Sequence, residues 1–190
     1  MLGPVIEGDR VRLEPPRLEQ APAFQRWLAD MEVTRYLLHR HPLTLRQEES
    51  FLEEAAADPD RVLWAIAVKD GEEAGTVIGA TVLEKIDWRN RDAESGIMIG
   101  DKREWRRGRA SEAMRLRTEY AFRELGLRKV WTGVWLPNHG SRRALEKAGY
   151  RQCGLMRRHF FGNGQWFDVW LAEVHREDWE QAAEASCSAR

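Results

Sequence analysis

Strand-like and helix-like hydrophobic patterns alternate along the whole chain, and this alternation restricts the fold more than any other feature. Some segments have the alternating or β-branched pattern of a strand, and others have the 3.6-residue apolar period of a helix. The predicted strands span residues 11–14, 62–68, 76–86, 93–99, 129–135, 150–161 and 165–174, and the predicted helices span residues 18–28, 44–57, 109–125 and 141–148. This order predicts an α/β (α+β) domain in which helices cover one central sheet.

The size and composition of the chain fit one domain with its own core. A length of 190 residues is typical of a single domain. Apolar residues make up 43% of the chain and charged residues 32%, which is ordinary for a folded protein. The last segment is small and polar, so we expect a domain over residues 1–180 and a frayed tail over residues 181–190.

Several classes of protein are disfavoured by what the sequence lacks. The uncharged stretch at residues 74–83 is about half of the roughly 20 residues that a membrane helix needs. The first residues lack the basic and apolar pattern of a secretory signal. The two cysteines, Cys153 and Cys187, show no metal-ligand spacing. We therefore expect a cytoplasmic protein with no membrane span, disulfide framework or metal site.

The formal net charge of −1 hides an uneven distribution. Residues 101–160 hold 16 Lys and Arg against 6 Asp and Glu, whereas the remainder holds 14 against 25. Arginine supplies 25 of the 30 basic residues, and its planar fork suits phosphate groups. The central segment is therefore a candidate for contact with a phosphorylated ligand or nucleic acid, although solvated helix faces would have the same composition. The acidic remainder would suit a cationic acceptor.

A basic segment at residues 105–113 follows one predicted strand and opens a predicted helix. Gly108 permits close approach of the backbone, and Ala110 is small. The backbone N–H groups from about Arg107 to Ser111 would point to one place in front of the helix, where anions bind. The pattern predicts an anion site, and an ordinary helix start after a basic loop is the alternative.

A second polar segment follows about 30 residues later, at residues 138–150. A predicted strand ends at Pro137, and Asn138 and Ser141 stand at the start of the next predicted helix. Both residue types are good helix N-caps, so at least one of them has that structural role.

Together these two segments resemble the GCN5-related N-acetyltransferase (GNAT) superfamily. The matching runs are Trp-x-x-Gly-x-Ala-Ser-Glu-Ala from Trp105 and Asn-x-x-Ser-x-x-x-Leu-Glu-Lys-x-Gly-Tyr from Asn138. Residues 9–15 and 164–168 are similar to its RimJ/RimL-type ribosomal-protein N-acetyltransferase branch, and the resemblance covers about residues 5–175. The superfamily often has glycine where Arg106 stands, so this arginine could shift the loop and add charge.

The resemblance implies a single GNAT domain, with a mixed central sheet of about seven strands splayed in the middle and about four flanking helices. Acetyl-CoA would bind where the strands 93–99 and 129–135 separate, without any metal. One backbone N–H of the first strand would polarise the thioester carbonyl. The residues implied in binding acetyl-CoA are Ile97, Met98 and Ile99 beside the pantetheine arm, Asn138 at its amide region, Ser141 next to Asn138, and Arg106, Arg107, Gly108, Arg109, Ala110 and Ser111 at the pyrophosphate.

The implied reaction, direct attack of an amine on a thioester, needs a neutral amine and a proton for the departing thiolate. Ser141 stands where many family members place a Ser or Tyr that donates this proton, and helix capping is its alternative role. The candidate base is Glu94, or Glu84 on the preceding strand, and each could instead be a solvated strand residue. An α-amino group, with a pKa of about 8, loses its proton more easily than a lysine, with a pKa of about 10.4.

In this superfamily the first helices and the last hairpin shape the groove for the acceptor amine. The candidates that line such a groove here are Trp27, Tyr36, His39, Trp88, Phe160, Phe161 and Trp166. Asp168 could meet the incoming amine as a counter-charge, or could pair with an arginine instead. These residues do not choose between a peptide N-terminus and a small amine.

Three functions remain open from the sequence. The first is an acetyl-CoA-dependent N-acetyltransferase of the α-amino group of a protein or peptide, such as a ribosomal protein N-terminus. The second is an acetyltransferase of a small amine, such as an amino acid, a polyamine or an antibiotic. The third is a ribosome- or RNA-binding module without catalysis, which is disfavoured because the cofactor interpretation already explains most of the basic excess. A homodimer is compatible with each function, and no direct role with nucleic acid is expected of an acetyltransferase.

Overall fold

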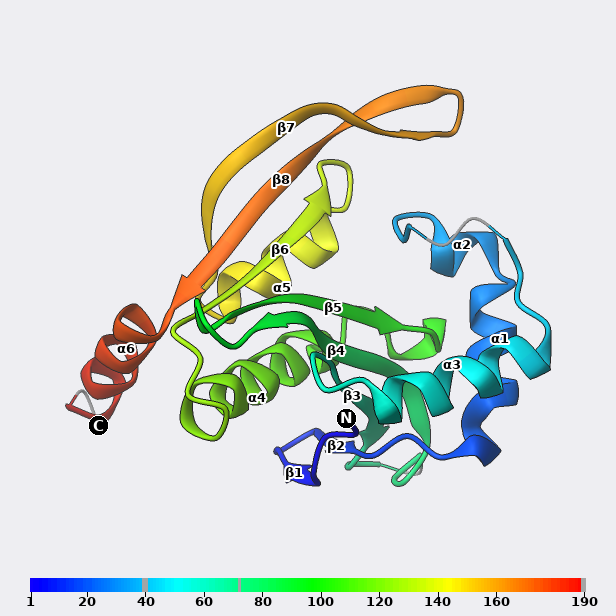
Figure 1. The fold of residues 1–190 in the computed structure, drawn as a ribbon, viewed down its shortest axis with the longest axis horizontal. Coiled ribbons are helices and arrows are strands. Elements are labelled where there is room, and N and C mark those ends of the chain that lie inside the picture. The colour runs from blue at the N-terminus through cyan, green and yellow to red at the C-terminus, as the bar shows by residue number, and fades with distance from the viewer. Residues whose placement is uncertain (39–40, 72, 189–190) are drawn as a thin grey trace.

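A computed structural model describes residues 1–38, 41–71 and 73–188, and its core is one sheet of eight strands (Figure 1). The strand order across the sheet is β1-β2-β3-β4-β5-β6-β8-β7. All neighbouring strands are antiparallel except β5 and β6, which are parallel. The strands are β1 (Ile6–Glu7), β2 (Val11–Glu14), β3 (Val62–Val68), β4 (Val77–Asp87), β5 (Asp92–Ile99), β6 (Lys129–Trp135), β7 (Arg151–Gly162) and β8 (Gln165–His175).

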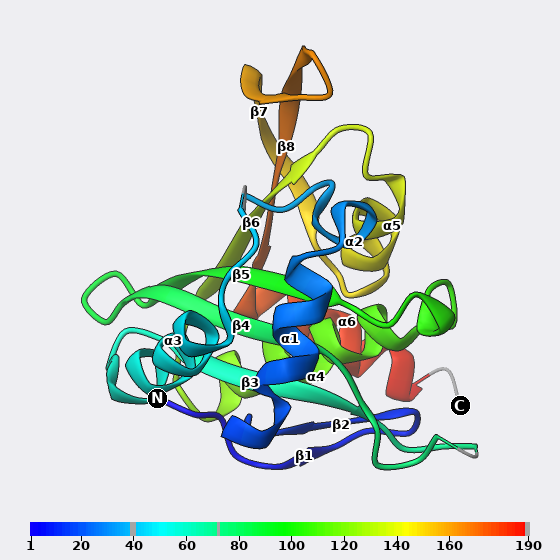
Figure 2. The same ribbon diagram turned by 90° about the vertical axis from the view of Figure 1, so that its right-hand side faces the viewer.

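Helices cover both faces of this sheet (Figure 2). The helices α1 and α3 lie on one face, and α4 lies on the other. Each face has its own hydrophobic cluster, with Phe24 and Leu52 on the first face and Met114 and Phe122 on the second. The helices are α1 (Ala21–Leu28), α2 (Met31–Thr34), α3 (Leu45–Ala57), α4 (Arg109–Arg123), α5 (His139–Lys147) and α6 (Arg176–Ser188), with short 3₁₀ turns η1 (Leu18–Gln20) and η2 (Lys102–Glu104).

Local sequence signals explain where these helices begin. Thr44 caps α3 with a capping box, because its side chain accepts the Gln47 N–H while the Gln47 side chain accepts the Thr44 N–H. Gly108 precedes α4 in the left-handed conformation, with φ of 81°. The Asn138 side chain caps α5 by accepting the Ser141 N–H at 3.1 Å. The helix predicted over residues 141–148 therefore begins two residues earlier than expected, at His139.

The mixed α/β domain expected from the sequence is confirmed, with three differences in its elements. The sheet has eight strands rather than about seven, because the two-residue β1 is too short to give a periodic pattern. The short α2 was also not expected. The segment from Gln181 was expected to be frayed, but α6 continues to Ser188, since alanine and glutamate favour a helix even where few residues are apolar.

The parallel strands β5 and β6 pair only at their first residues. The partners are Asp92 with Lys129, Ala93 with Val130 and Glu94 with Trp131. Beyond them both strands continue, to Ile99 and Trp135, without pairing to each other. The last link is the Thr132 hydroxyl, which donates to the Ser95 carbonyl at 2.8 Å. The sheet is therefore open in the middle, as the resemblance implied.

No helix within the described part of the chain combines the length and the apolar character that a membrane span requires.

One carboxylate in the fold is buried at a cost. Glu48 on α3 is only 3% exposed, and its Oε2 atom has no hydrogen-bond partner among the described residues. Burial disfavours the charged form and raises the pKa of Glu48 from its usual 4.5 to about 6. Because the carboxylate is penalised only in the folded state, the free energy of unfolding should fall as the pH rises from about 4.5 to 6.

We expect Glu48→Gln to raise the free energy of unfolding at pH 7.5 by about 1–2 kcal/mol, since the amide has no charge to bury. The variant should also lose the decline between about pH 4.5 and 6. Urea denaturation across this pH range measures both effects, with Glu53→Gln on the exposed side of the same helix as the control. Equal effects of the two substitutions would contradict the assignment.

Candidate active site

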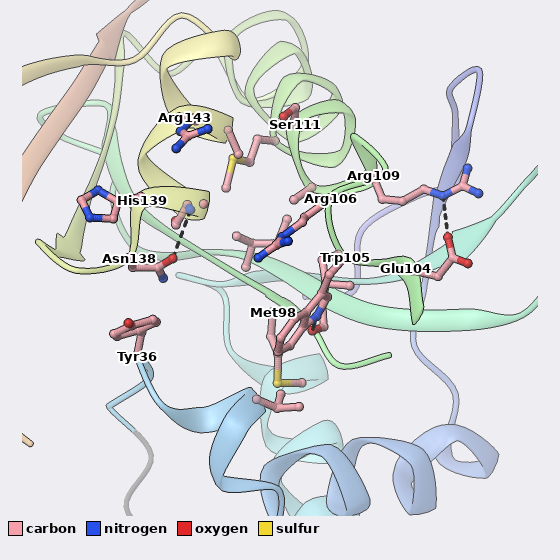
Figure 3. Close-up of a pocket in the computed structure, with 18 of the residues that line it drawn as sticks. Tyr36, Met98, Glu104, Trp105, Arg106, Arg109, Ser111, Asn138, His139 and Arg143 are labelled. Atoms are coloured by element: carbon pink, nitrogen blue, oxygen red, sulfur yellow. Dashed lines mark hydrogen bonds and ion pairs between the residues drawn. The ribbon is translucent and has the colours of Figure 1, made fainter. Parts of the chain in front are cut away.

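A cavity of about 860 Å³ lies where β5 and β6 separate (Figure 3). Its walls come from the α2 region, the end of β5, the loop before α4, and the start of α5. Most residues that the resemblance implied in binding acetyl-CoA line it, namely Ile97, Met98, Ile99, Arg106, Gly108, Arg109, Ala110, Ser111, Asn138 and Ser141. Arg107 is the one implied residue that lies outside this lining.

The loop before α4 presents its backbone to the cavity. Gly108 has φ of 81°, and Arg106 also has a positive φ, of 62°. A left-handed backbone favours glycine, which gives a physical reason why the superfamily often has glycine where Arg106 stands. The Arg106 side chain points into the cavity (Figure 3). The loop therefore offers an arginine and the free N–H groups of a helix start to the same space.

The neighbouring arginines have a different role from the one expected. Arg109 is 6% exposed, and its Nε donates to Glu104 at 2.9 Å while its Nη1 pairs with Asp70. Burial lowers the pKa of Arg109, but the hydrogen bonds to Glu104 and Asp70 outweigh it, so the net shift is upward. Figure 3 shows the guanidinium directed away from the cavity. Arg107 is exposed and lies 3.5 Å from Glu104. Arg109 thus contributes its backbone, rather than its charge, to the cavity.

The N-terminal hairpin holds this loop in place. Both carboxylate oxygens of Glu112 accept backbone N–H groups, from Asp9 at 2.5 Å and from Arg10 at 3.0 Å. Arg109 donates in turn to the Arg10 carbonyl at 2.8 Å. A fourth hydrogen bond runs from the Arg10 Nη1 to the Arg107 carbonyl at 3.5 Å, so residues 9–15, which resemble the RimJ/RimL branch, are joined to residues 105–113 by four hydrogen bonds.

The backbone of β5 alternates between β4 and the cavity. The Gly96 carbonyl faces β4, where the Thr81 hydroxyl donates to it at 3.0 Å, and a Cβ built on Gly79 of β4 would meet the Met98 carbonyl at 2.0 Å. Because N–H and C=O of one strand residue point the same way and alternate along the strand, Ile97 and Ile99 face the gap. These two residues therefore have backbone groups available to a ligand, and Met98 does not.

Trp105 covers one of these backbone groups. Its indole Nε1 donates to the Ile99 carbonyl at 2.8 Å, and the side chain lines the cavity (Figure 3). The Ile99 carbonyl is thus already partnered. Ile97, which is nearer to the closed end of the gap, is the residue of β5 whose backbone groups a ligand could pair with.

Asn138 and Ser141 divide the two roles that the sequence left open. Asn138 is the N-cap of α5, through its Oδ1. The Ser141 hydroxyl makes no hydrogen bond with any residue that the structure describes, and it lines the cavity. Its arrangement leaves this hydroxyl able to donate to a group bound in the cavity.

The wall opposite the loop comes from α2 and the residues after it. Tyr36 lines the cavity and packs edge-on against Trp135, with ring centroids 6.3 Å apart. Lys102 ties α2 to the end of β5, since its Nζ lies 2.8 Å from Asp30 and 2.9 Å from Glu32. The hydrogen bonds to these carboxylates raise the pKa of Lys102, although all three side chains are accessible to solvent.

The two carboxylates predicted as bases do not line the cavity. Glu84 and Glu94 are cross-strand partners near the closed end of the gap. The Glu94 carboxylate lies 2.6 Å from Lys85, and Glu84 lies 3.9 Å from Arg61. Each therefore has a cation beside it. The sequence pattern could not show that β5 and β6 are still paired at Glu94, where the gap has not yet opened.

The predicted acceptor residues scatter, and Tyr36 alone among the described ones lines the cavity. Trp27 packs on Gly100, where an added Cβ would lie 2.0 Å from its ring. Trp88 lies at the β4–β5 turn and donates to Asp60 at 2.8 Å. His39 lies outside the described residues.

The predicted acceptor residues of the β7–β8 hairpin contact one another, the hairpin backbone or β6, and none of them lines the cavity. Phe161 and Trp166 pack on each other edge to face, 5.4 Å apart, and Phe160 stacks on Trp135 at 4.8 Å. Asp168 accepts the Arg158 N–H at 2.8 Å, at an irregularity in β7, so it holds a backbone bulge and not a cavity wall.

Several residues that line the cavity were not identified from the sequence. The basic ones are Arg35, which follows α2, and Arg143 and Lys147 on α5. Their charge gave no sign in the sequence of facing a cavity. Glu32, Glu104 and His139 also line it. A helical wheel places Arg143 and Lys147 on one face of α5, four residues apart, which is the signal that could have found them.

Comparison with known proteins agrees with this geometry. The family model described as "Acetyltransferase (GNAT) domain" matches residues 10–151. The uncharacterized N-acetyltransferase YoaA of Bacillus subtilis (strain 168) is 30% identical over 169 residues, which cover 87% of this chain and 93% of that protein. YdaF of the same strain, whose name proposes a ribosomal N-acetyltransferase, is 31% identical over 106 residues, or 56% of this chain and 57% of that protein.

Solved structures share the fold. A GNAT-family acetyltransferase from Bacillus anthracis has a TM-score of 0.77 at 20% identity and covers 91% of this chain and 99% of its own. The spermidine N-acetyltransferase of Vibrio cholerae, in complex with CoA and spermine, has a TM-score of 0.81 at 19% identity and covers 90% and 99%. With the family model spanning most of the sequence and YoaA matching nearly its whole length, the chain belongs to the GNAT family of N-acetyltransferases.

Proposed function

We propose that this acetyltransferase transfers the acetyl group of acetyl-CoA to the α-amino group of a protein or peptide, as a RimJ/RimL-type enzyme. A ribosomal protein N-terminus is the acceptor suggested by the resemblance and by the name of YdaF. The choice of acceptor rests on one observation: the carboxylates that line the cavity are already paired with cations.

Both carboxylates that line the described cavity are already paired with cations. Glu104 pairs with Arg109 at 2.9 Å, and Glu32 pairs with Lys102 at 2.9 Å. Because each already pairs with a cation, neither carboxylate is free to hold the ammonium form of a strongly basic amine. An α-amino group, whose pKa is about 8, is partly neutral near pH 7.5, whereas a lysine or a polyamine nitrogen near 10.4 is almost fully charged. This site therefore favours an acceptor that needs little help to lose its proton.

The cavity supplies the groups that an acetyl-CoA donor requires. The free N–H groups at the start of α4, together with Arg106, form the place for the pyrophosphate. The pantetheine arm would lie along β5, where Ile97 faces the gap, with the Asn138 amide on the other side. Arg143 and Lys147 add positive charge along α5 for the remaining phosphate.

In the reaction, the amine nitrogen bonds to the thioester carbonyl carbon, and the C–S bond then breaks with its electron pair on sulfur. The Ser141 hydroxyl donates a proton to the departing thiolate and regains one from the nitrogen through solvent. Glu94, or its cross-strand partner Glu84, remains the proposed base. It would act through water, because neither lines the cavity, and would take the extra proton of the ammonium form of the amine before the attack.

The acceptor assignment predicts a preference that a substrate panel can measure. At pH 7.5, peptides with a free α-amino group should be acetylated at least about tenfold faster than N-blocked peptides carrying a lysine, or than spermidine, because the neutral fraction differs by roughly 100-fold. Release of the CoA thiol gives the rate. Faster turnover of spermidine would establish the small-amine alternative, and no thiol release with any amine, alongside salt-sensitive RNA binding, would favour the binding module.

Gly108→Val is expected to weaken CoA binding by on the order of 100-fold, because a β-branched residue cannot readily hold the φ of 81° on which the loop depends. Gly126→Val is a matched control, since Gly126 has φ of 66° just beyond the other end of α4 and does not line the cavity. Calorimetric titration with CoA should show normal affinity for the control. Equal affinities in the two variants would refute the pyrophosphate assignment.

Ser141→Ala should lower kcat by on the order of 100-fold and leave the Kd for CoA nearly unchanged, because Asn138, and not Ser141, caps α5. Ser141→Thr keeps a hydroxyl and should recover part of the rate. Steady-state kinetics with the best peptide, together with CoA titration, separate the two effects. An unchanged kcat in Ser141→Ala would remove this serine from the mechanism.

A further inference from the structure

A buried arginine on α4 has no anionic partner among the residues that the structure describes. Arg117 on α4 is 1% exposed. Its Nη1 donates to the Thr81 hydroxyl at 2.7 Å and to the Gly96 carbonyl at 2.8 Å, and its Nη2 donates to the Tyr150 hydroxyl at 3.3 Å. Its Nε has no partner, and no carboxylate pairs with it, within the ranges that the structure describes.

Burial of this arginine lowers the stability of the fold, and a residue that only fills space would not need a charge. Arg117 lies between α4 and the sheet, among residues such as Met114 and Ala121 that are apolar and buried. A guanidinium removed from water without a carboxylate keeps most of its desolvation cost, and an apolar side chain of similar volume commonly stabilises such a site. The cost points to a task that an apolar residue could not perform.

The contact of Arg117 falls on the peptide unit that borders the gap. The Gly96 carbonyl, which receives both Arg117 and the Thr81 hydroxyl, belongs to the same planar peptide as the Ile97 N–H. The carbonyl faces β4, and the N–H faces the gap from which β6 has separated. Donors on a carbonyl polarise the whole peptide and make its N–H a stronger donor.

We propose that Arg117 is a positioning residue for acetyl transfer, which fixes and polarises the Gly96–Ile97 peptide so that the Ile97 N–H receives the developing oxyanion. The inference rests on the proposed function. When the amine nitrogen bonds to the carbonyl carbon, the negative charge that collects on the carbonyl oxygen is stabilised by this N–H until the C–S bond breaks and the thiolate takes up a proton. A preorganised donor of this kind acts mainly on the transition state.

The neighbouring hydroxyls provide a matched pair of variants. Thr81 and Thr118 are 1% and 0% exposed, and each forms a hydrogen bond inside the same network. Thr81 contacts the Gly96 carbonyl directly, whereas Thr118 contacts the Tyr150 hydroxyl at 3.0 Å. Replacement of either by valine removes one buried hydroxyl with little change in shape, so a general loss of packing would affect both alike.

The experiment compares Arg117→Met, Arg117→Lys, Thr81→Val and Thr118→Val with the wild type. Arg117→Met should lower kcat by about tenfold or more, with little change in the Kd for CoA. Arg117→Lys, which retains the charge but not the fork, should fall between Arg117→Met and the wild type. Thr81→Val should lower kcat, and Thr118→Val should not.

The amide ¹⁵N resonance of Ile97 reads the same peptide without any acceptor. It should move in Arg117→Met and in Thr81→Val, and remain in place in Thr118→Val. Equal kcat values for the two threonine variants, or an Ile97 resonance indifferent to Arg117→Met, would overturn the proposal. A wild type that acetylates no amine would instead show that the proposed function itself is wrong, so the two failures are distinguishable.

Discussion

The structure depends on a break in one strand pairing. β5 and β6 are joined over only three residue pairs and then continue without each other. Each unpaired strand exposes backbone N–H and C=O groups that need partners. The cavity is the space left by this break, and its walls from α2, the loop before α4, and α5 are placed around it. A ligand that supplies the missing backbone partners is therefore the natural occupant of the fold.

Many of the charged side chains around the break form ion pairs and hydrogen bonds within the protein and do not face the cavity. Arg109, at the helix start, pairs with Glu104 and Asp70 and reaches the Arg10 carbonyl, so its charge fixes the loop. Arg106 is the arginine of this loop that points into the cavity. To the proposed anion site this loop thus contributes mostly backbone N–H groups, whose positions are set by ion pairs outside it. The other basic side chains that line the cavity, Arg35, Arg143 and Lys147, come from the α2 region and from α5 and not from this loop.

The sequence predicts well the features that depend on local patterns, and poorly those that depend on where strands end. The α3 capping box at Thr44, the loop at Gly108 and the cap at Asn138 follow from short-range rules, and they place most of the predicted acetyl-CoA residues at the cavity. The position of Glu94 could not be predicted in this way. It depends on the pairing of β5 with β6 at Trp131, a long-range register that no periodicity encodes. The sequence could not show whether Trp27 lines the cavity, because its packing on Gly100 is a tertiary contact.

Arg117 shows why a residue outside the cavity can belong to its chemistry. A helix pattern assigns position 117 to the buried face of α4, and an arginine there violates the rule that buried positions are apolar. Local rules are broken where another requirement outweighs stability. Here the gap leaves the Ile97 N–H without a strand partner, and the peptide that carries it would be held from the β4 side only. The Arg117 Nη1, which donates to both the Thr81 hydroxyl and the Gly96 carbonyl, restores the rigidity that a paired β6 would have given. The open sheet and the buried cation are therefore two parts of one arrangement.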